Sequence, residues 1–171
     1  MIFNQPPDIN KRRINQVLKY LERFDLKGKI LDVGQRSPMT EAIEKRFWVE
    51  IDNTEYNLDY LFRYPRTGYD FILYLYTIEH QFNPLNTLFQ LKAILRKSGK
   101  LIVVYPSNNC KLIWSKYHYH EIDRYRFKQL VEAAGLKIER FDQRMPCCRI
   151  NGIRPILRYL LGYNAYYTLT K

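Results

Sequence analysis

The chain has 171 residues, of which 46% are hydrophobic and 26% are charged. This composition is that of an ordinary globular protein and excludes a disordered chain or a fibrous repeat, and one domain accounts for the length. The formal charge of +11 attracts anionic partners such as phosphorylated sugars, acidic glycans, nucleic acid or an anionic membrane surface. The basic residues are scattered instead of forming one tract, so nucleic acid is not the favoured partner.

The cysteines and the N-terminal residues bear on where the protein works. Cys110, Cys147 and Cys148 are odd in number and lack metal-ligand spacing, so we expect reduced, buried thiols. The first residues do not resemble a signal peptide, and no apolar run reaches the roughly 18 residues of a membrane span. We therefore expect a cytoplasmic protein without a transmembrane segment.

The first half of the sequence predicts an amphipathic helix over 10–25, with its apolar residues on one face. Ile30 to Val33 form a short apolar strand that Gly34 closes, and a helix follows over about 41–46. Further strands are expected over 47–52 and 71–75. This half therefore predicts strand, turn, helix and two more strands.

The second half continues the alternation of helices and strands. In order, we expect a helix from Asn83-Pro84 to Ser98-Gly99, a strand over 101–105 ended by Pro106, a helix from Asp123 to Gly135, a strand over 136–141, a helix over 153–161 and a strand over 165–169. Strands that are apolar on both faces and alternate with amphipathic helices indicate a parallel sheet covered by helices on both faces.

The helix expected over 153–161 is basic and amphipathic. Helices of this kind bind anionic membranes, so a peripheral contact with a membrane or a lipid-linked substrate is one interpretation. A cover for the sheet edge or a contact between two copies of the chain is the other.

The turn after the first strand is the expected ligand site. In an open parallel sheet, ligands bind outside the carboxyl ends of the strands. Gly34 has no Cβ, so it lets the backbone approach a ligand, and an acid at the end of the second strand can accept hydrogen bonds from ribose hydroxyls. Glu50 or Asp52 would be that acid.

Four motifs in order resemble those of class I S-adenosylmethionine-dependent methyltransferases. They are Ile30-Leu31-Asp32-Val33-Gly34; Tyr69-Asp70-Phe71-Ile72-Leu73 running into Ile78-Glu79-His80 and Asn83-Pro84; Leu95 to Leu101 followed by Pro106; and Glu132-Ala133-Ala134-Gly135-Leu136. The resemblance covers roughly residues 28–142 and implies an α/β, Rossmann-like fold: a mostly parallel, doubly wound sheet with an antiparallel C-terminal strand and helices on both faces. We expect one domain over 1–171, with an N-terminal helix in 1–27, the core in 28–142, and the basic segment and last strand in 143–171.

The resemblance also implies S-adenosylmethionine as the cofactor. The residues expected to bind it are Asp32, Gly34, Arg36, Glu50, Asp52, Asp59 and Tyr74. The chain departs from the family after Gly34, where Gln35-Arg36-Ser37-Pro38 replaces further glycines. Arg36 is suited to pair with the methionine carboxylate of the cofactor.

A second departure lies between Asp52 and Asp70. This stretch is too short for the helix that the family places between its second and third strands. Asn57-Leu58-Asp59 would stand where the family's third-strand acid contacts the adenine. We therefore expect a cofactor cleft that is more open on this side.

An oxygen or nitrogen acceptor needs a base, and the candidate catalytic residues are Glu79, His80, His118 and His120. The resemblance places Glu79 and His80 beside the methionine end of the cofactor, although His80 is equally suited to cap the next helix. His118 and His120 are candidates for an acceptor-site base oriented by Glu121, or for a polar loop packed on nearby aromatic rings. No third distant ligand accompanies this loop, so no metal is expected.

The aromatic side chains of Trp114, Tyr117 and Tyr119 suit stacking on a sugar or a base. The leading hypothesis is therefore methyl transfer to a small-molecule or glycan-like acceptor. The positive charge of the chain is compatible with an anionic acceptor. A catalytically inactive domain that serves as a binding or partner subunit is the first alternative, and an RNA methyltransferase is the second.

Overall fold

The computed structural model describes residues 11–54, 59, 64–108, 114–146 and 153–171. The helices are α1 (Lys11–Leu21), α2 (Pro38–Phe47), α3 (Pro84–Ile94), α4 (Arg124–Ala133) and α5 (Ile153–Leu161), with a short 3-10 helix η1 (Ile78–His80). The strands are β1 (Ile30–Asp32), β2 (Ile51–Asn53), β3 (Tyr69–Leu75), β4 (Leu95–Asn108), β5 (Lys137–Arg144) and β6 (Gly162–Thr170). Cys110, Cys147, Cys148, Asn57 and Leu58 lie outside the described residues, so the expectations about them remain predictions.

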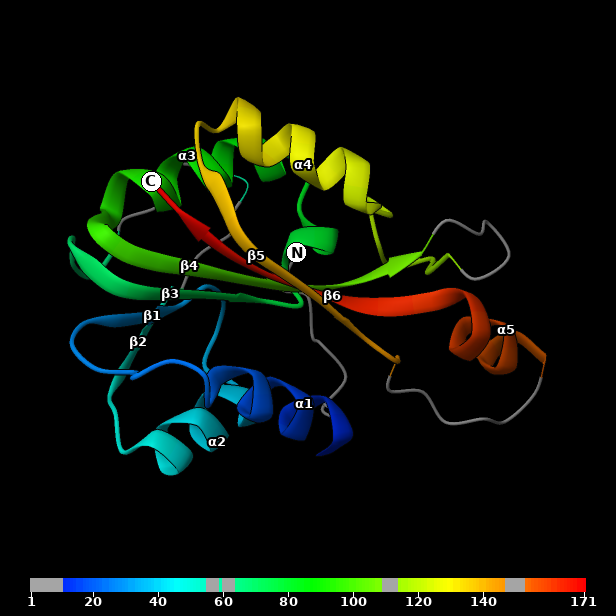
Figure 1. Cartoon of the computed structure of the whole chain (residues 1–171), viewed down its shortest axis with the longest axis horizontal. Coiled ribbons are helices and arrows are strands. Elements are labelled where there is room, and N and C mark those ends of the chain that lie inside the picture. Colours follow the sequence, from blue (N-terminus) through cyan, green and yellow to red (C-terminus); the bar gives the residue numbers. More distant parts are fainter. Residues whose placement is uncertain (1–10, 55–58, 60–63, 109–113, 147–152) are drawn as a thin grey trace.

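The six strands form one sheet in the order β2-β1-β3-β4-β6-β5 (Figure 1). β1 pairs in parallel with β2 and β3, and β3 pairs in parallel with β4. β6 is antiparallel to both of its neighbours, β4 and β5. The predicted fold, a mostly parallel sheet with an antiparallel C-terminal strand, is confirmed.

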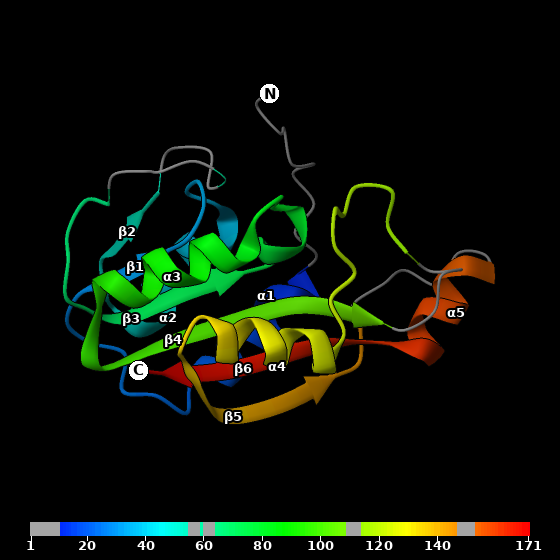
Figure 2. The ribbon, with the colours of Figure 1, turned by 90° about the horizontal axis from the view of Figure 1, so that it is seen from above.

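Helices cover both faces of the sheet, as predicted. Figure 1 shows α3 and α4 on one face and α1 and α2 on the other, and Figure 2 looks down on the α3/α4 face. Alternate residues of the strands point to opposite faces, so Leu31 and Ile72 join the core under α3 and α4, whereas Ile30 and Leu73 join the core over α1 and α2. Each helical layer therefore covers one face of the sheet with its own hydrophobic core.

The prediction of a strand over 47–52 is wrong at its start. α2 runs on to Phe47, which is partly buried against the α1/α2 core. Trp48 then closes the helix in the left-handed conformation with φ 57°, and its N–H donates to the carbonyl of Glu44 at 2.8 Å. The apolar run that suggests a strand therefore belongs to a helix end, and β2 begins only at Ile51.

The predicted helix after Asn83 is also too long at its far end. Asn83 caps α3 as expected, but the helix ends at Ile94 and β4 starts directly at Leu95. Leu95 pairs with Tyr69 and Lys100 pairs with Phe71, so the residues between Leu95 and Lys100 bulge out of the ladder. β4 also continues through Pro106, which lies opposite Asn164 of β6.

Two further features of the fold are the connection between β2 and β3 and the helix α5. The described residues between β2 and β3 contain no helix. α5 has the predicted bounds. It directly precedes β6 and lies at the amino end of that strand, away from the other helices in both views (Figures 1 and 2). None of the described helices is long and apolar enough to cross a membrane.

Candidate functional site

The turn after β1 requires glycine for its backbone conformation. Gly34 has φ +140°, a value that side chains with a Cβ rarely adopt. A Cβ built there would meet the Thr77 hydroxyl at 3.8 Å as its nearest neighbour. Steric crowding is therefore not the reason for glycine here, and the space over Gly34 is open.

The last residue of β2, Asn53, and the residue after it, Thr54, hold this turn. Gly34 donates its N–H to the Thr54 hydroxyl at 2.8 Å, and the Gly34 carbonyl accepts from the Asn53 side-chain amide at 3.2 Å. Sequence reasoning missed Asn53 and Thr54, although polar residues directly after a predicted strand were a usable signal. The end of β2 therefore fixes the turn through side chains.

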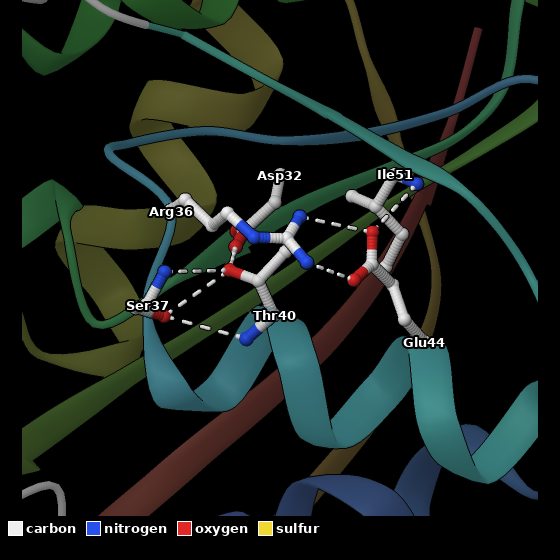
Figure 3. Close-up of polar contacts among 6 residues, drawn as sticks. All are labelled: Asp32, Arg36, Ser37, Thr40, Glu44 and Ile51. Atoms are coloured by element: carbon white, nitrogen blue, oxygen red, sulfur yellow. Dashed lines mark hydrogen bonds and ion pairs between the residues drawn. The ribbon is translucent and has the colours of Figure 1, made fainter.

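Asp32 ties the turn to the helix that follows it. Its buried carboxylate accepts a hydrogen bond from the Thr40 hydroxyl at 2.6 Å, and Thr40 also forms a capping box with Ser37 at the start of α2 (Figure 3). Burial raises the pKa of Asp32 to about 6, against the lowering effect of hydrogen bonds from Thr40 and Asn53. Asp32 therefore anchors α2 from inside the protein.

Arg36 pairs with a residue two turns along α2. Its Nη1 donates to Glu44 Oε1 at 3.1 Å and its Nη2 donates to Glu44 Oε2, which makes the pair bidentate (Figure 3). Glu44 also accepts the backbone N–H of Ile51 at 3.2 Å, and its pKa is lowered chiefly by Arg36. A guanidinium group has two edges that each present a pair of N–H donors, so this pairing uses one edge and orients the other.

The two acids expected near the ribose differ in position. Glu50 is exposed and precedes β2, so it lies at the amino end of that strand. Asp52 lies within β2, where its carboxylate accepts from the Tyr69 hydroxyl at 3.0 Å and lies 3.4 Å from Arg66 Nε. Of the two acids, Asp52 is therefore the one nearer to the carboxyl edge of the sheet.

Asp59 and Tyr74 are placed by the structure next to the start of α3. Asp59 Oδ1 accepts the backbone N–H groups of Phe82 and Asn83, at 2.7 and 3.0 Å. Tyr74 is fully buried in the α3/α4 core and donates its hydroxyl to Gln81. Both side chains therefore shape the segment between β3 and α3, and Tyr74 does not reach solvent.

Glu79, His80 and His118 come together at the carboxyl end of β3, although His118 is far from the other two in sequence. The rings of His80 and His118 are 5.0 Å apart, and His80 Nε2 lies 4.0 Å from Glu79 Oε1. The Glu79 side chain is buried, and its Oε2 has no hydrogen-bond partner among the described residues. Burial raises the pKa of Glu79, and the two imidazoles oppose that rise.

The loop over 114–121 is attached to this cluster by its backbone. The N–H groups of Tyr119 and His120 approach the Glu79 carbonyl at 2.9 and 3.3 Å. His120 instead directs its ring to Phe82, where Nε2 donates to the carbonyl at 3.2 Å. The His118 ring therefore lies beside Glu79 and His80, with its Nδ1 3.1 Å from Glu121 Oε1, whereas the His120 ring turns to Phe82.

A cavity of about 680 Å³ lies between this loop, the start of α3 and α4. Its walls include Trp114, His118, Tyr119, His120 and Arg126. None of the residues expected to bind the cofactor lines it. The cavity is therefore separate from the Gly34 turn, and the histidines stand at its edge.

Thr77 connects the turn to the histidines. Its hydroxyl hydrogen-bonds the carbonyl of Val33 at 3.2 Å, and its own carbonyl accepts the N–H of His80 at 3.0 Å. Both features therefore lie along the same edge of the sheet, at the carboxyl ends of β1 and β3. Ligands of open parallel sheets bind at this edge.

Comparisons with known proteins agree with this geometry. The family model described as Methyltransferase domain matches residues 8–140. No curated protein matches the sequence. Similar solved structures include a SAM-dependent methyltransferase from Archaeoglobus fulgidus, which is 12% identical, with 91% of this chain and 94% of that chain covered and a TM-score of 0.62.

Two other similar structures are described by different roles. The (4+2)-cyclase SpnF is 14% identical, with 92% of this chain and 81% of that chain covered and a TM-score of 0.65. A chain from a complex with the Haloferax volcanii Trm112 methyltransferase activator is 11% identical, with coverages of 94% and 91% and a TM-score of 0.63. Identities this low establish the fold alone, and one fold hosts several reactions.

Proposed function

Because the chain belongs to the methyltransferase domain family, we propose that it transfers a methyl group from S-adenosylmethionine to a small-molecule or glycan-like acceptor. The observation that carries the proposal is the Gly34 turn, which lies at the carboxyl end of β1, has a backbone conformation that residues with a Cβ rarely adopt, and has, among the described residues, only the Thr77 hydroxyl within 4 Å of a Cβ built there. Family membership supports S-adenosylmethionine as the cofactor, and the neighbour from Archaeoglobus fulgidus is a methyltransferase that depends on it.

The residues at the turn fit this cofactor. Gly34 offers bare backbone, and the second edge of the Arg36 guanidinium suits the methionine carboxylate. Asp52, together with Asn53, would hold the ribose at the end of β2, and Asp32 would act by fixing the turn through Thr40. When bound, the cofactor supplies a methyl group activated by its sulfonium, so the protein chiefly aligns the acceptor and excludes water.

We place the acceptor in the cavity beside the 114–121 loop. Trp114 and Tyr119 offer aromatic faces to a sugar or a similar ring, and Arg126 offers a positive charge to an anionic group. His118 and His120 face the same space. Their ring nitrogens are the candidate bases for a proton on an acceptor oxygen or nitrogen, and His80 and Glu79 lie beside His118, outside the cavity lining.

Titration calorimetry with S-adenosylhomocysteine tests the cofactor site. We expect the wild-type chain to bind, and Gly34→Ala to weaken binding at least about tenfold because its backbone conformation excludes a Cβ. Gly68→Ala is the matched control, since Gly68 also has positive φ, +73°, but nothing lies within 4 Å of an added Cβ. Equal loss in both variants, or no binding by the wild-type chain, would overturn the proposed site.

The acceptor site is tested by release of S-adenosylhomocysteine in the presence of a panel of sugars and small anionic acceptors. We expect Trp114→Ala to lower turnover of the best acceptor by about two- to tenfold, the worth of one aromatic contact. Cofactor affinity should not change. Loss of cofactor affinity in Trp114→Ala would instead show that the loop belongs to the cofactor site.

A partner subunit without activity of its own is the second candidate. It is favoured by a turn whose polar groups are already bound within the chain, by Thr54, Asn53 and Glu44. The neighbour from the complex with an activator protein supports this candidate, because it has the same fold. The calorimetric titration separates the two candidates, because the partner subunit predicts no heat on adding S-adenosylhomocysteine.

A further inference from the structure

We propose that Glu79, His80 and His118 bind one divalent transition-metal ion, with Zn²⁺ the ion that suits them best. One ligand atom from each of these residues lies within 4.8 Å of the other two. A carboxylate with two imidazoles is a donor set that holds zinc with a fourth position open. This inference concerns a different set of residues from the cofactor turn and does not depend on cofactor binding.

The hydrogen bonds of the two imidazoles determine which nitrogens are available. His80 Nδ1 lies 2.9 Å from the Tyr117 carbonyl, and His118 Nδ1 lies 3.1 Å from Glu121 Oε1. A carbonyl or carboxylate oxygen only accepts, so both Nδ1 atoms carry the proton. In each neutral ring the lone pair is then on Nε2.

This is the arrangement found around metal-binding histidines, whose second ring nitrogen donates to a carbonyl or a carboxylate. The partner fixes the tautomer and the ring orientation before the ion arrives. Tyr117 and Glu121 fill these two supporting roles here, one with a backbone carbonyl and one with a carboxylate. Both residues are far from Glu79 and His80 in the sequence, so the fold is what brings the ligands and their supporting groups together.

Glu79 supplies the negative charge. Its side chain is 3% exposed, and Oε2 has no hydrogen-bond partner among the described residues. A buried carboxylate without a full set of partners is costly, and a bound cation removes that cost. The cation would also lie between the imidazoles of His80 and His118, whose ring centroids are 5.0 Å apart in an edge-to-face arrangement.

The distances need only small side-chain movements. Ligand atoms about 2.1 Å from a tetrahedral zinc lie roughly 3.4 Å apart, and His80 Nε2 is 4.0 Å from Glu79 Oε1. Magnesium and calcium prefer oxygen ligands, whereas imidazole selects zinc and similar ions. We therefore expect Zn²⁺ and Co²⁺ to bind and Mg²⁺ to bind far more weakly.

Metal binding is measured directly by titrating metal-free protein with Zn²⁺ and, in parallel, with Co²⁺ followed by visible absorption. The background is the full chain with Cys110, Cys147 and Cys148 changed to Ser, because thiolates also bind these ions. We expect one ion per chain. His80→Ala and His118→Ala should each weaken binding at least about tenfold, and Glu121→Gln by about ten- to a hundredfold through loss of orientation.

His120→Ala is the matched control, because His120 lies in the same loop but directs its ring to Phe82. It should bind Zn²⁺ like the parent. Binding that is unchanged in His80→Ala and His118→Ala, or lost equally in His120→Ala, overturns the metal site. A folding check by circular dichroism accompanies each variant, and the Co²⁺ spectrum of Glu121→Gln reports on the ligand geometry even where stability changes.

The metal site and the proposed function fail separately. The metal-free parent is also titrated with S-adenosylhomocysteine. Cofactor binding without Zn²⁺ binding overturns the metal site alone, and Zn²⁺ binding without cofactor binding overturns the proposed methyl transfer alone.

Discussion

Thr40 donates its hydroxyl hydrogen to the buried carboxylate of Asp32 at 2.6 Å, and so the first turn of α2 is fixed to the strand before it. The same hydroxyl takes part in the capping box with Ser37. The conformation of the Gly34 turn between them therefore depends on a residue of the helix that follows it.

Thr40→Val should lower the free energy of unfolding by about 2 kcal/mol, because it removes a hydrogen bond from a buried carboxylate and one half of the capping box. Urea denaturation measures the change. Thr40→Ser keeps the hydroxyl, so its free energy of unfolding should stay within about 0.5 kcal/mol of the wild-type value. A valine variant as stable as wild type would contradict the anchoring role.

Asp32 should make stability depend on pH. Its pKa rises from 3.8 to about 6 in the folded protein, so between these values the folded state binds more protons than the unfolded state. The contribution of Asp32 to the free energy of unfolding is therefore fully present below about pH 3.8 and is lost as pH rises through about 6. This pH-dependent contribution is about 3 kcal/mol.

The comparison that isolates this effect is with Asp32→Asn, whose side chain is neutral at every pH. The unfolding free energy of the wild type, minus that of Asp32→Asn, should fall as pH rises from about 4 to about 7. A difference that is constant over this interval, or that rises, would show that Asp32 keeps an ordinary pKa.

Arg36→Gln should weaken binding of S-adenosylhomocysteine about tenfold, by the loss of one charged hydrogen-bonded contact. Methylthioadenosine has no amino-acid carboxylate, so its affinity should not change. Because the Arg36 side chain is 52% exposed, losing the pair with Glu44 should alter stability by less than about 1 kcal/mol. Equal affinity losses for both ligands would argue against a contact with the carboxylate.

Trp48→Gly should stabilise the protein by about 0.5–1 kcal/mol. Trp48 is 92% exposed and has φ 57° at the end of α2, a conformation that strains a residue with a Cβ but not glycine. Trp48→Ala removes the same ring and keeps the strain, so it should stay near wild type. Thermal unfolding of the three proteins distinguishes the backbone effect from the loss of the ring.

Local patterns in the sequence predict much of the fold. The strand and turn from Ile30 to Gly34 are read from neighbouring residues alone, as is the cap of α4 by Asp123. The strand assigned to 47–52 fails because Phe47 and Trp48 are residue types common in strands, and only the left-handed turn at Trp48 reveals the helix end.

The candidate site is less predictable, because its contacts join distant residues. His80 and His118 are both chosen from sequence as catalytic candidates, but their meeting at 5.0 Å depends on how the 114–121 loop returns to β3. Asn53 and Thr54 take their roles from the path of the Gly34 backbone. Residue types indicate chemistry, whereas these pairings require the whole sheet.

The order of strands in the sheet differs from their order along the chain, and this affects synthesis. β6 lies between β4 and β5, so Lys137–Arg144 leaves the ribosome before the strand that joins it to the sheet. Until then this segment is an unpaired edge, the kind of surface on which chains aggregate. Its sequence, KIERFDQR, is mostly charged and polar, and such residues disfavour aggregation of the segment before β6 pairs with it.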